Sequence, residues 1–453
     1  MYFWVHSPIK LGMQKNTSIS SATFQELFNS FLPTKIIRHW FRALGPAKRR
    51  PPKLRPEQFI MSLVFHFLAG AGTLAQHVKL LTGIVITDGA LSQRRTALPW
   101  QIVETLLEVG LRPKALEQKH PEAFYKGFRL SGVDGSRFSV ANTPTIKKSM
   151  SKATSRRARA AFPKVGVSVL VELGIHNPMA AAIGVKEESE MVLSRQLLDR
   201  LPEKSLLLAD RYYGVPVLLI EFKEIHPRGQ REFLVRVKSN LKRRVLEHYP
   251  DGSALVEIRA EKQTLLVREI VGQVRRGNGK WSRIRLWTSL LDWRKHPASE
   301  LLALYARRWE QESFYRELKV DLRSAPLVQS HTPLTAAQEI AALIMAYAIL
   351  VEERIQAAKA GDLPVLRISF LKTLEAMRGL WHFLEVSADL LKEGGVRLIV
   401  QRTLRELAQR AIPKRRQRSC PRGLRQPVSS WPRLLKNTYA KGEPQYDLIP
   451  VTA

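Results

Sequence analysis

Four polar side chains have the types and the spacing to act together on an anion. Tyr305, Arg308, Glu312 and Lys319 stand at offsets of 0, 3, 7 and 14 residues. At about 100° per residue, these offsets place all four within roughly 60° of one another on one face of a helix. One face would therefore present a phenol, a guanidinium, a carboxylate and an ammonium to the same partner.

An exposed, salt-bridged helix is the alternative explanation of this pattern, because glutamate and lysine usually lie on solvated helix faces. Phe314 and Leu318 fall on roughly the opposite face, where they would anchor the helix and turn its polar face toward a cleft. Glu310 and Glu317 lie about 140° and 120° around the helix from Tyr305. We therefore expect both of these glutamates to be dispensable.

Glu312 has a clear use as a metal ligand, because magnesium requires oxygen ligands and few proteins enclose it completely. Asp134 in GVDGS and Asp210 in LLLADRYYG each follow an apolar segment, as expected of ligands fixed at strand ends. Taken alone, Asp-Gly-Ser is most often a tight turn and Asp-Arg a helix start. Two strand aspartates followed by a helix glutamate favour a joint site.

The chain is strongly basic, with 73 Lys and Arg residues against 40 Asp and Glu residues and a formal net charge of +33. A polyanionic partner is therefore the leading expectation. The 453 residues, 45% of them hydrophobic, suffice for a sizeable core and about two to four domains. A ribosomal or chromatin-packing protein is the alternative, but such proteins are usually short and poor in tryptophan, whereas this chain has nine.

Cysteine usage and hydropathy argue against other classes of protein. Cys420 is the only cysteine, and the histidines lack the spacing of a structural zinc site. The longest apolar run, residues 340–351, is well short of the roughly 20 residues that span a membrane. We expect a cytoplasmic protein with no membrane partner.

The segments that must position these side chains begin with a helical region. Apolar residues recur at helical spacing from Phe24 to Leu111, which predicts a helical N-terminal domain. Residues 35–55 hold eight Lys and Arg residues and no acid, and residues 91–95 (LSQRR) stand where a short DNA-contacting helix could begin. A solvated charged surface is the alternative for both segments.

The hydropathy pattern changes at Phe128. FRLSGVDGSRFSV alternates like two strands around a glycine-containing turn, and residues 165–174 and 205–210 predict two more strands. EMVLSRQLLDRL between them predicts a helix. This order favours an α/β sheet of mixed strand directions.

Later segments predict a β-rich block at about 231–291 and helices over most of 299–411. Two segments are strongly basic: residues 147–164 carry seven Lys and Arg residues, and residues 402–436 carry eleven with a single acid and four prolines. We expect both to lie along DNA. A disordered loop is the alternative for residues 147–164.

Tyr305, Arg308, Glu312 and Lys319 together resemble the Y-(2)-R-(3)-E-(6)-K signature of the IS4 family of insertion-sequence transposases. Because the signature fixes both residue types and spacing, it is fairly specific. An exposed helix face need not follow that spacing.

The two upstream aspartates extend the resemblance, because Asp134-Gly-Ser and Asp210-Arg-x-Tyr look like the catalytic aspartates of that family. The resemblance covers about residues 125–350. It implies an α/β fold: a ribonuclease-H-like catalytic core with a β-rich insertion, flanked by a helical N-terminal domain and a helical, basic C-terminal region. The implied domains are 1–20 (unassigned extension), 21–124 (helical, DNA-binding), 125–375 (catalytic core, insertion at about 231–291) and 376–453 (C-terminal region).

The resemblance also implies a reaction and a cofactor. Asp134, Asp210 and Glu312 would bind two Mg²⁺ ions per active site, with Mn²⁺ as a substitute, for cleaving and rejoining DNA phosphodiesters. The other members of the signature, Tyr305, Arg308 and Lys319, would contact DNA phosphates near the cleaved bond.

Further DNA contacts are carried over from relatives of this family. Arg236 and Lys238 alternate along one predicted strand, so both would face the DNA end, and Arg211 follows Asp210 directly. Trp281 and Trp287 could hold a base flipped out of the duplex. Core packing is the alternative for both tryptophans.

The expected partners are double-stranded DNA, both as terminal inverted repeats and as target DNA, and a second copy of the chain in the DNA complex. The site of action would be the bacterial cytoplasm, at the nucleoid. Two other functions stay open: a metal-dependent nuclease or resolvase that cuts without rejoining, and a domesticated transposase that only binds DNA.

Overall fold

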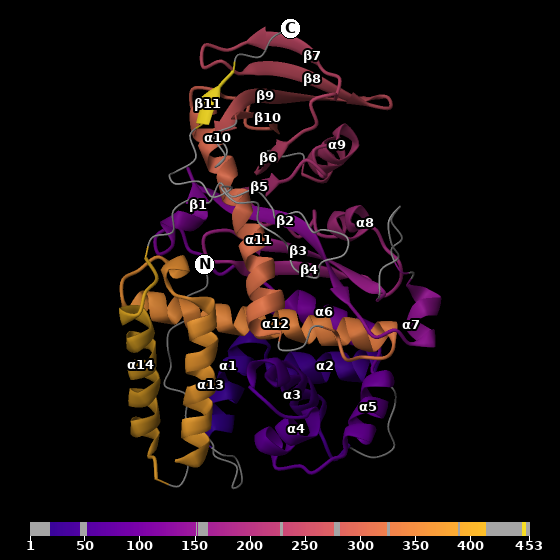
Figure 1. Cartoon of the computed structure of the whole chain (residues 1–453), viewed down its shortest axis with the longest axis vertical. Coiled ribbons are helices and arrows are strands. Elements are labelled where there is room, and N and C mark those ends of the chain that lie inside the picture. Colours follow the sequence, from indigo (N-terminus) through magenta and orange to yellow (C-terminus); the bar gives the residue numbers. More distant parts are fainter. Residues whose placement is uncertain are drawn as a thin grey trace, which may run out of the picture.

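The computed structural model describes residues 19–45, 52–150, 152, 162–226, 230–275, 281–323, 327–387, 390–413 and 446–449. Helices α1 to α6 gather at one end of the molecule, and the strands form a continuous stack that reaches the other end (Figure 1). Helix α12 (Pro333–Ala360) lies between these two parts.

In the described part of the chain, six α-helices precede the first strand, which confirms the predicted helical N-terminal region. Phe24 and Phe65 pack their rings against Trp381 of α13 (Phe370–Val386), so the first helices share a core with the C-terminal ones. The six are α1 (Ile19–Phe31), α2 (Thr34–Leu44), α3 (Pro56–Leu68), α4 (Leu74–Thr82), α5 (Asp88–Thr96) and α6 (Trp100–Gly110).

The half of the sheet that carries Asp134 and Asp210 has the order β4-β3-β2-β5-β6. Strands β2, β3 and β4 pair antiparallel, whereas β5 pairs in parallel with both β2 and β6. Three antiparallel strands followed by two parallel ones are the arrangement of a ribonuclease-H-like core, so this prediction is confirmed. The strands are β1 (Phe124–Tyr125), β2 (Phe128–Ser139), β3 (Lys164–Glu172), β4 (Asn177–Ile183), β5 (Ser205–Ala209) and β6 (Arg231–Arg236).

Strand β2 corrects one sequence expectation. FRLSGVDGSRFS forms one continuous strand rather than two strands around a turn, because it pairs with β3 without interruption from Ser131 to Ser139. Gly135 serves close packing instead of a turn. A Cβ atom at Gly135 would lie 2.2 Å from Cγ of Glu190, so only glycine admits that side chain.

The β-rich insertion extends the same sheet. Strand β10 (Trp281–Thr288) pairs antiparallel with β6 and with β9 (Gln263–Arg275), and β8 (Ala254–Ala260) and β7 (Arg244–His248) follow. The expected start at 231 is therefore too early, because β6 pairs with β5 as a core strand. A C-terminal strand, β11 (Tyr446–Leu448), adds to β9.

The chain returns from the insertion to the core through one helical run. Its segments are α10 (Ala298–Tyr305), the 3₁₀ turn η2 (Ala306–Arg308), α11 (Trp309–Arg316) and the π-helical turn η3 (Glu317–Leu322). Three short helices flank the sheet, α7 (Pro144–Ser149), α8 (Glu190–Arg195) and α9 (Pro216–Ile225). After α12 and α13, α14 (Glu393–Gln409) completes the helices predicted over 299–411.

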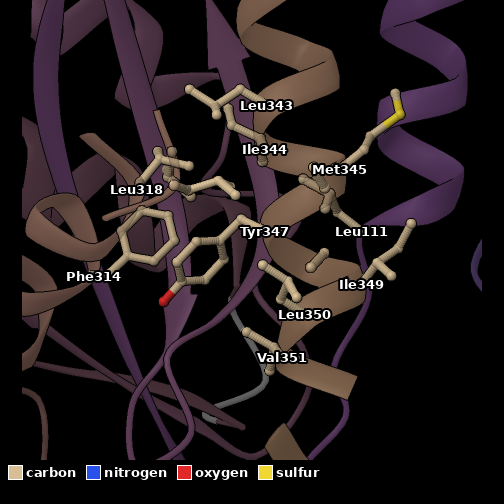
Figure 2. Packing of buried hydrophobic residues seen from close by; sticks show 14 of the residues in the cluster. Leu111, Phe314, Leu318, Leu343, Ile344, Met345, Tyr347, Ile349, Leu350 and Val351 are labelled. Atoms are coloured by element: carbon tan, nitrogen blue, oxygen red, sulfur yellow. The ribbon is translucent and has the colours of Figure 1, made fainter. Parts of the chain in front are cut away.

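Helix α12 is the central core helix. It is long and apolar enough to cross a membrane by length and composition, but 89% of its most apolar window is buried inside the protein. Figure 2 shows its apolar side chains beside those of the helical run. The residues seen there include Phe314 and Leu318 on one side and Leu343, Ile344, Tyr347, Leu350 and Val351 on the other.

Candidate active site

The pairing of β2 with β5 brings the two aspartates together. These strands are parallel, and Gly132 pairs with Leu208 at the last position of the ladder. Two residues further along, the same register places Asp134 beside Asp210, which directly follows β5. Both residues therefore lie at the carboxyl end of this strand pair, close enough for the charge of Asp210 to act on the Asp134 carboxyl.

The surroundings of Asp134 disfavour its negative charge. Burial raises the pKa of the Asp134 carboxyl to about 7, and the charges of Glu190 and Asp210 add to this shift. A hydrogen bond from the Gly135 N–H to Oδ1, 2.9 Å long, and the charge of Arg308 act in the opposite direction. The site thus concentrates negative charge in a way that a bound cation would relieve.

Arg308 and Glu312 form an ion pair with 3.2 Å between Nη2 and Oε1. Burial lowers the pKa of the Arg308 guanidinium, but its interactions with Tyr305, Glu312 and Asp134 outweigh burial and raise the pKa overall. Arg308 therefore lies within electrostatic range of both Glu312 and Asp134. Arg308 thus connects Glu312 electrostatically to Asp134, and the joint site of Glu312 with the two aspartates stays a prediction.

Tyr305 belongs to this group but faces inward. Its side chain is 7% exposed, and its hydroxyl donates to the carbonyl oxygen of Ala209 at 3.1 Å. Ala209 is the last residue of β5, so Tyr305 supports the strand end that carries Asp210. This placement does not support the contact between Tyr305 and DNA that the sequence predicts.

Lys319 lies one turn beyond α11, in the π-helical turn η3. Its Nζ donates to Ser136 Oγ at 3.0 Å and to the Arg137 carbonyl at 2.9 Å, and it lies 5.2 Å from the centre of the Phe138 ring. Lys319 thus binds strand β2 just after Asp134. The signature residues follow a helical run whose winding changes three times, rather than the single regular helix predicted.

The donor atoms suit a hard divalent cation by type, because all are carboxylate oxygens on or beside a rigid sheet. Glu312 is held by Arg308 in this conformation. Among the residues described, no three Asp, Glu, His or Cys side chains lie close enough to enclose a metal ion. Metal binding that includes Glu312 therefore requires its ion pair with Arg308 to loosen.

A cavity of about 930 Å³ opens beside Asp210, between the core and the insertion. It brings together all three further DNA-contact candidates, Arg211, Arg236 and Lys238. The sequence analysis missed three more cations in its lining, which are Arg243, Arg283 and Arg285. The alternation of arginine in SRIRLW, on one face of β10, could have indicated the last two.

Not all of these cations are equally accessible. Arg285 is tied to Glu269 and to the carbonyls of Lys238, Ser239 and Leu241, so it fixes the insertion against the loop after β6. Arg211, Lys238 and Arg283 are exposed. The cavity therefore has an exposed cationic rim suited to DNA phosphates.

The two tryptophans of β10 have different environments. Trp287 is fully buried and its indole N–H donates to Glu269 Oε2 at 2.8 Å, which supports its alternative role in core packing. Trp281 is 42% exposed at the start of the strand. Trp281 alone keeps an accessible ring for stacking.

Glu190 is the acidic residue that sequence reasoning missed. It is the first residue of α8, capped by Ser189, and its Oε1 accepts a hydrogen bond from the Tyr213 hydroxyl at 2.8 Å. Nothing in the sequence KEESEM distinguishes Glu190 from its acidic neighbours. Only the fold shows that it packs on Gly135, the residue after Asp134.

The expectation that Glu310 and Glu317 are dispensable does not fit their contacts. Glu310 accepts from the Gly174 N–H at 2.6 Å and pairs with Arg307 at 2.7 Å. Glu317 is buried and accepts from His176 at 3.0 Å and from Tyr347 at 2.6 Å. A helical wheel places both away from the signature face but cannot show that the opposite face is also packed.

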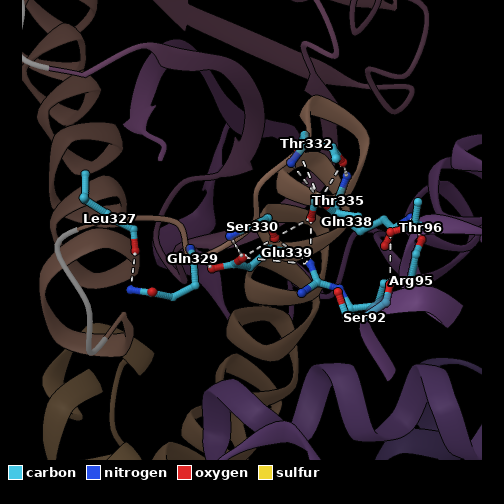
Figure 3. Close-up of polar contacts among 10 residues, drawn as sticks. All are labelled: Ser92, Arg95, Thr96, Leu327, Gln329, Ser330, Thr332, Thr335, Gln338 and Glu339. Carbon is cyan, nitrogen blue, oxygen red and sulfur yellow. Dashed lines mark hydrogen bonds and ion pairs between the residues drawn. The ribbon is translucent and has the colours of Figure 1, made fainter. Parts of the chain in front are cut away.

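Figure 3 shows that Arg95 of the LSQRR segment lies against the core rather than in solvent. Its guanidinium donates to Ser330 Oγ and to the Thr335 carbonyl, both at 2.7 Å, while Gln338 donates back to the Arg95 carbonyl at 2.9 Å. The neighbouring Arg94 lies over the Phe59 ring. The Arg95 contacts fasten α5 to α12 and its preceding loop, and Arg94 packs α5 against α3.

Parts of the other basic segments cannot be assessed in this way. Residues 46–51, 151, 153–161 and 414–445 lie outside the described residues. The expected DNA contacts of 35–55, 147–164 and 402–436 therefore remain predictions.

Comparison with known proteins relates this site to one family. The family profile described as "Transposase DDE domain" matches residues 127–349. The transposase InsG of insertion sequence element IS4, from Escherichia coli K12, is 24% identical over 89% of this chain and 92% of its own length. The putative transposase InsZ from the same strain is 24% identical over 43% of this chain and 66% of its own length.

One solved structure is also similar in outline. The piggyBac transposase synaptic complex with hairpin DNA covers 86% of this chain and 85% of its own, at 10% identity and a TM-score of 0.41. The matched family segment begins just before β2 and ends within α12, so it includes Asp134, Asp210 and Glu312.

Proposed function

Because this chain belongs to the transposase DDE domain family and is a DNA transposase of the IS4 type, we propose that Asp134, Asp210 and Glu312 are its catalytic, metal-binding carboxylates. The parallel register of β2 and β5 is the observation that supports this proposal most directly, since it aligns Asp134 with Asp210. Arg308 connects Glu312 to the two aspartates, because it lies within electrostatic range of both Glu312 and Asp134.

Transposases of this family act as polynucleotidyl transferases and use divalent metal ions. We propose Mg²⁺ as the ion, two per active site, with Mn²⁺ as a functional substitute. Such ions activate a water or a DNA 3′-hydroxyl as nucleophile and stabilise the leaving oxygen. Of the chain's own residues, Arg308 balances the negative charge around Asp134 and Glu312, and Tyr305 holds the strand end before Asp210.

The DNA that carries the scissile phosphate would lie along the cavity beside Asp210. Arg211, Arg236 and Lys238 line this cavity and would contact the phosphate backbone, since lysine and arginine bind phosphates without reading sequence. We propose that residues 21–124 bind the DNA end and that residues 125–375 form the catalytic unit. Arg95 would keep these two parts in a fixed relative position.

The substrates would be the terminal inverted repeats of an insertion sequence and a target DNA, handled in the nucleoid. We propose that the active form is a homodimer holding two DNA ends. Sedimentation under cleaving conditions tests this, and a single chain per DNA end would contradict it.

Joining of a labelled DNA end to a target plasmid tests the proposed function. A transposase gives Mg²⁺-dependent joined products. A metal-dependent nuclease or resolvase gives cut ends that never join, and a domesticated transposase gives only a mobility shift. Either of the last two outcomes would replace the proposal.

A further inference from the structure

We propose that Glu190 is a fourth acidic member of the metal site, which strengthens divalent-ion binding at Asp134 and Asp210 by its charge. This inference rests on the proposed function, because it assumes that the two aspartates bind the metal. It concerns a residue that lies 56 positions from Asp134 and 20 from Asp210 in the sequence. The case rests on where the fold holds the Glu190 side chain.

The Glu190 side chain lies directly over the strand that carries Asp134. A Cβ atom on Gly135 would be 2.2 Å from Cγ of Glu190, 2.3 Å from its Cδ and 2.7 Å from its Oε2. A side chain at position 135 would therefore push the Glu190 carboxylate away. Because position 135 is glycine, the Glu190 carboxylate can pack against the residue that follows Asp134.

A relay of hydroxyl groups connects Glu190 to both aspartate-bearing segments. The Tyr213 hydroxyl donates to Glu190 Oε1 at 2.8 Å and lies 3.0 Å from Ser194 Oγ. Ser194 in turn lies 2.8 Å from Ser168 Oγ, which donates to the Asp134 carbonyl at 3.3 Å. These contacts, made by three hydroxyl groups, position the carboxylate relative to β2.

The same relay reaches Asp210, because Tyr213 belongs to the turn that follows β5. The Tyr213 N–H donates to the Asp210 carbonyl at 3.2 Å, and the Tyr213 ring is buried. Glu190 is therefore fixed to the Asp210 turn at one side and to the Asp134 strand at the other.

A purely structural role explains this arrangement less well. A glutamate in the first turn of a helix gains from the helix dipole, but this gain needs no contact with Gly135 or Tyr213. Tyr213 is the hydrogen-bond donor that the described residues supply to Glu190, and it binds Oε1. The other oxygen, Oε2, lies against Gly135, 2.7 Å from where a Cβ atom at that position would stand.

Placing a third carboxylate beside two others is costly unless a cation is present. Residues that support metal ligands from outside the first coordination shell typically change metal affinity by about 10- to 100-fold when mutated. Glu190→Gln is the sharpest variant, because glutamine still accepts the Tyr213 hydrogen bond but has no charge. Glu203→Gln, an exposed glutamate before β5, is the matched control.

The test is a Mn²⁺ titration of the full-length protein, with the free ion measured by electron paramagnetic resonance, for wild type, Glu190→Gln, Glu203→Gln and Asp210→Asn. We expect Glu190→Gln to weaken Mn²⁺ binding about 10-fold and Glu203→Gln to leave it unchanged. The Mg²⁺ concentration that half-saturates DNA cleavage should rise by the same factor. Thermal unfolding without metal distinguishes a structural role of Glu190 from an electrostatic one. Loss of a structural contact would lower the melting temperature, whereas removal of a like charge would leave it unchanged or raise it.

Wild-type Mn²⁺ affinity and wild-type Mg²⁺ dependence in Glu190→Gln, with binding lost in Asp210→Asn, would overturn the role of Glu190 and leave the proposed function intact. If Asp210→Asn also keeps wild-type Mn²⁺ affinity, both the role of Glu190 and the proposed function would be overturned. A lower melting temperature of Glu190→Gln with unchanged ion affinity would also overturn the proposal, because it would show that Glu190 only supports the fold.

Discussion

The phenol of Tyr305 donates a hydrogen bond to the carbonyl oxygen of Ala209 across 3.1 Å. Through this bond the helical run that carries Arg308 and Glu312 is attached to the strand end that carries Asp210. The three proposed metal ligands come from two strands and one helix, so their mutual geometry depends on such attachments. Tyr305 is one such attachment, and Tyr315, whose hydroxyl donates to the Asp134 carbonyl at 2.8 Å, is another.

Tyr305→Phe should therefore lower cleavage rather than DNA affinity. Loss of one buried hydrogen bond costs about 1 kcal/mol of unfolding free energy, and the freed helix should reduce the cleavage rate at saturating DNA. Urea unfolding and single-turnover cleavage measure the two effects, with Tyr249→Phe in the insertion as control. Weaker DNA binding at unchanged stability would instead support the contact with DNA that the sequence predicts.

Alanine variants of Asp134, Asp210 and Glu312 should each abolish strand cleavage and leave DNA binding within a few-fold of wild type, because they remove metal ligands rather than phosphate contacts. Nicking assays and mobility shifts measure these properties. Glu203→Ala is the appropriate control, since Glu310 and Glu317 are both packed against the core. Retained Mg²⁺-dependent nicking in any one variant would remove that residue from the site.

Glu317 should make stability depend on acid pH. Burial raises the pKa of its carboxyl, but Arg354, His176 and the hydrogen bonds from His176 and Tyr347 outweigh burial and lower the pKa to about 2. A carboxyl with a depressed folded-state pKa stabilises the fold above its ordinary value of 4.5. This contribution is lost progressively as the pH falls from there through 2.

Glu317→Gln should consequently cost about 3–5 kcal/mol at pH 7, because it leaves Arg354 without its buried counter-charge. The difference in unfolding free energy between Glu317→Gln and wild type should decrease as the pH is lowered toward 3. Urea unfolding at both pH values measures it. A gap of equal size at pH 7 and pH 3 would show that the charge of Glu317 contributes nothing.

The sequence predicted the elements that depend on local pattern. The strands around Asp134 and Asp210, the helix of Glu312 and the all-helical start follow from hydropathy period and appear in the structure. Pattern also predicted strand β6, but not its partner. The pairing of β6 with β5 joins two separate segments of the chain. Local periodicity carries no information about such pairing.

Close packing of side chains from distant segments was the other source of error. Gly135 looked like a turn residue, because glycine after aspartate is a common turn signal, yet it is needed where Glu190 crosses the strand. Arg95 looked like a DNA contact, since the sequence could not show that Ser330 and Thr335 would accept its hydrogen bonds. At both places the residue type was known, but the role of the residue depends on partners that are distant in the sequence.

The cationic cavity should control how DNA affinity responds to salt. Each phosphate contact that is lost lowers the slope of log affinity against log salt by about 0.9. Lys238→Ala and Arg283→Ala should each flatten this slope, whereas Arg259→Ala, an exposed arginine of β8 that does not line the cavity, should not. Fluorescence anisotropy across a salt series measures the slopes. If the slopes of all three variants are equal, the DNA does not lie along this cavity.

Removal of residues 402–453 is the simplest way to test the basic tail, with a flatter salt slope as the expected result if the tail contacts DNA. Such a truncation also deletes β11 and part of α14, so its effect on binding would mix with an effect on the fold. Neutralising the arginines of 414–425 while keeping β11 is the cleaner test. An unchanged salt slope would mean that this part of the tail does not contact DNA.

Lys319 gives the last prediction, and here sequence and structure offer competing roles. Seven residues of helix span about 10.5 Å, which places Lys319 too far from Glu312 to share a metal and suits it to a phosphate near the cut. The structure shows Nζ bound to Ser136 Oγ and the Arg137 carbonyl on strand β2.

If Lys319 binds phosphate, Lys319→Ala should lower the cleavage rate at low DNA concentration without changing metal dependence, and Lys319→Arg should recover part of the loss. If it instead holds β2, Ser136→Ala should reproduce part of the defect and Lys319→Ala should lower the melting temperature. Single-turnover cleavage over a range of DNA concentrations, together with thermal unfolding of all three variants, distinguishes these roles, and wild-type behaviour of Lys319→Ala in both measurements would contradict both.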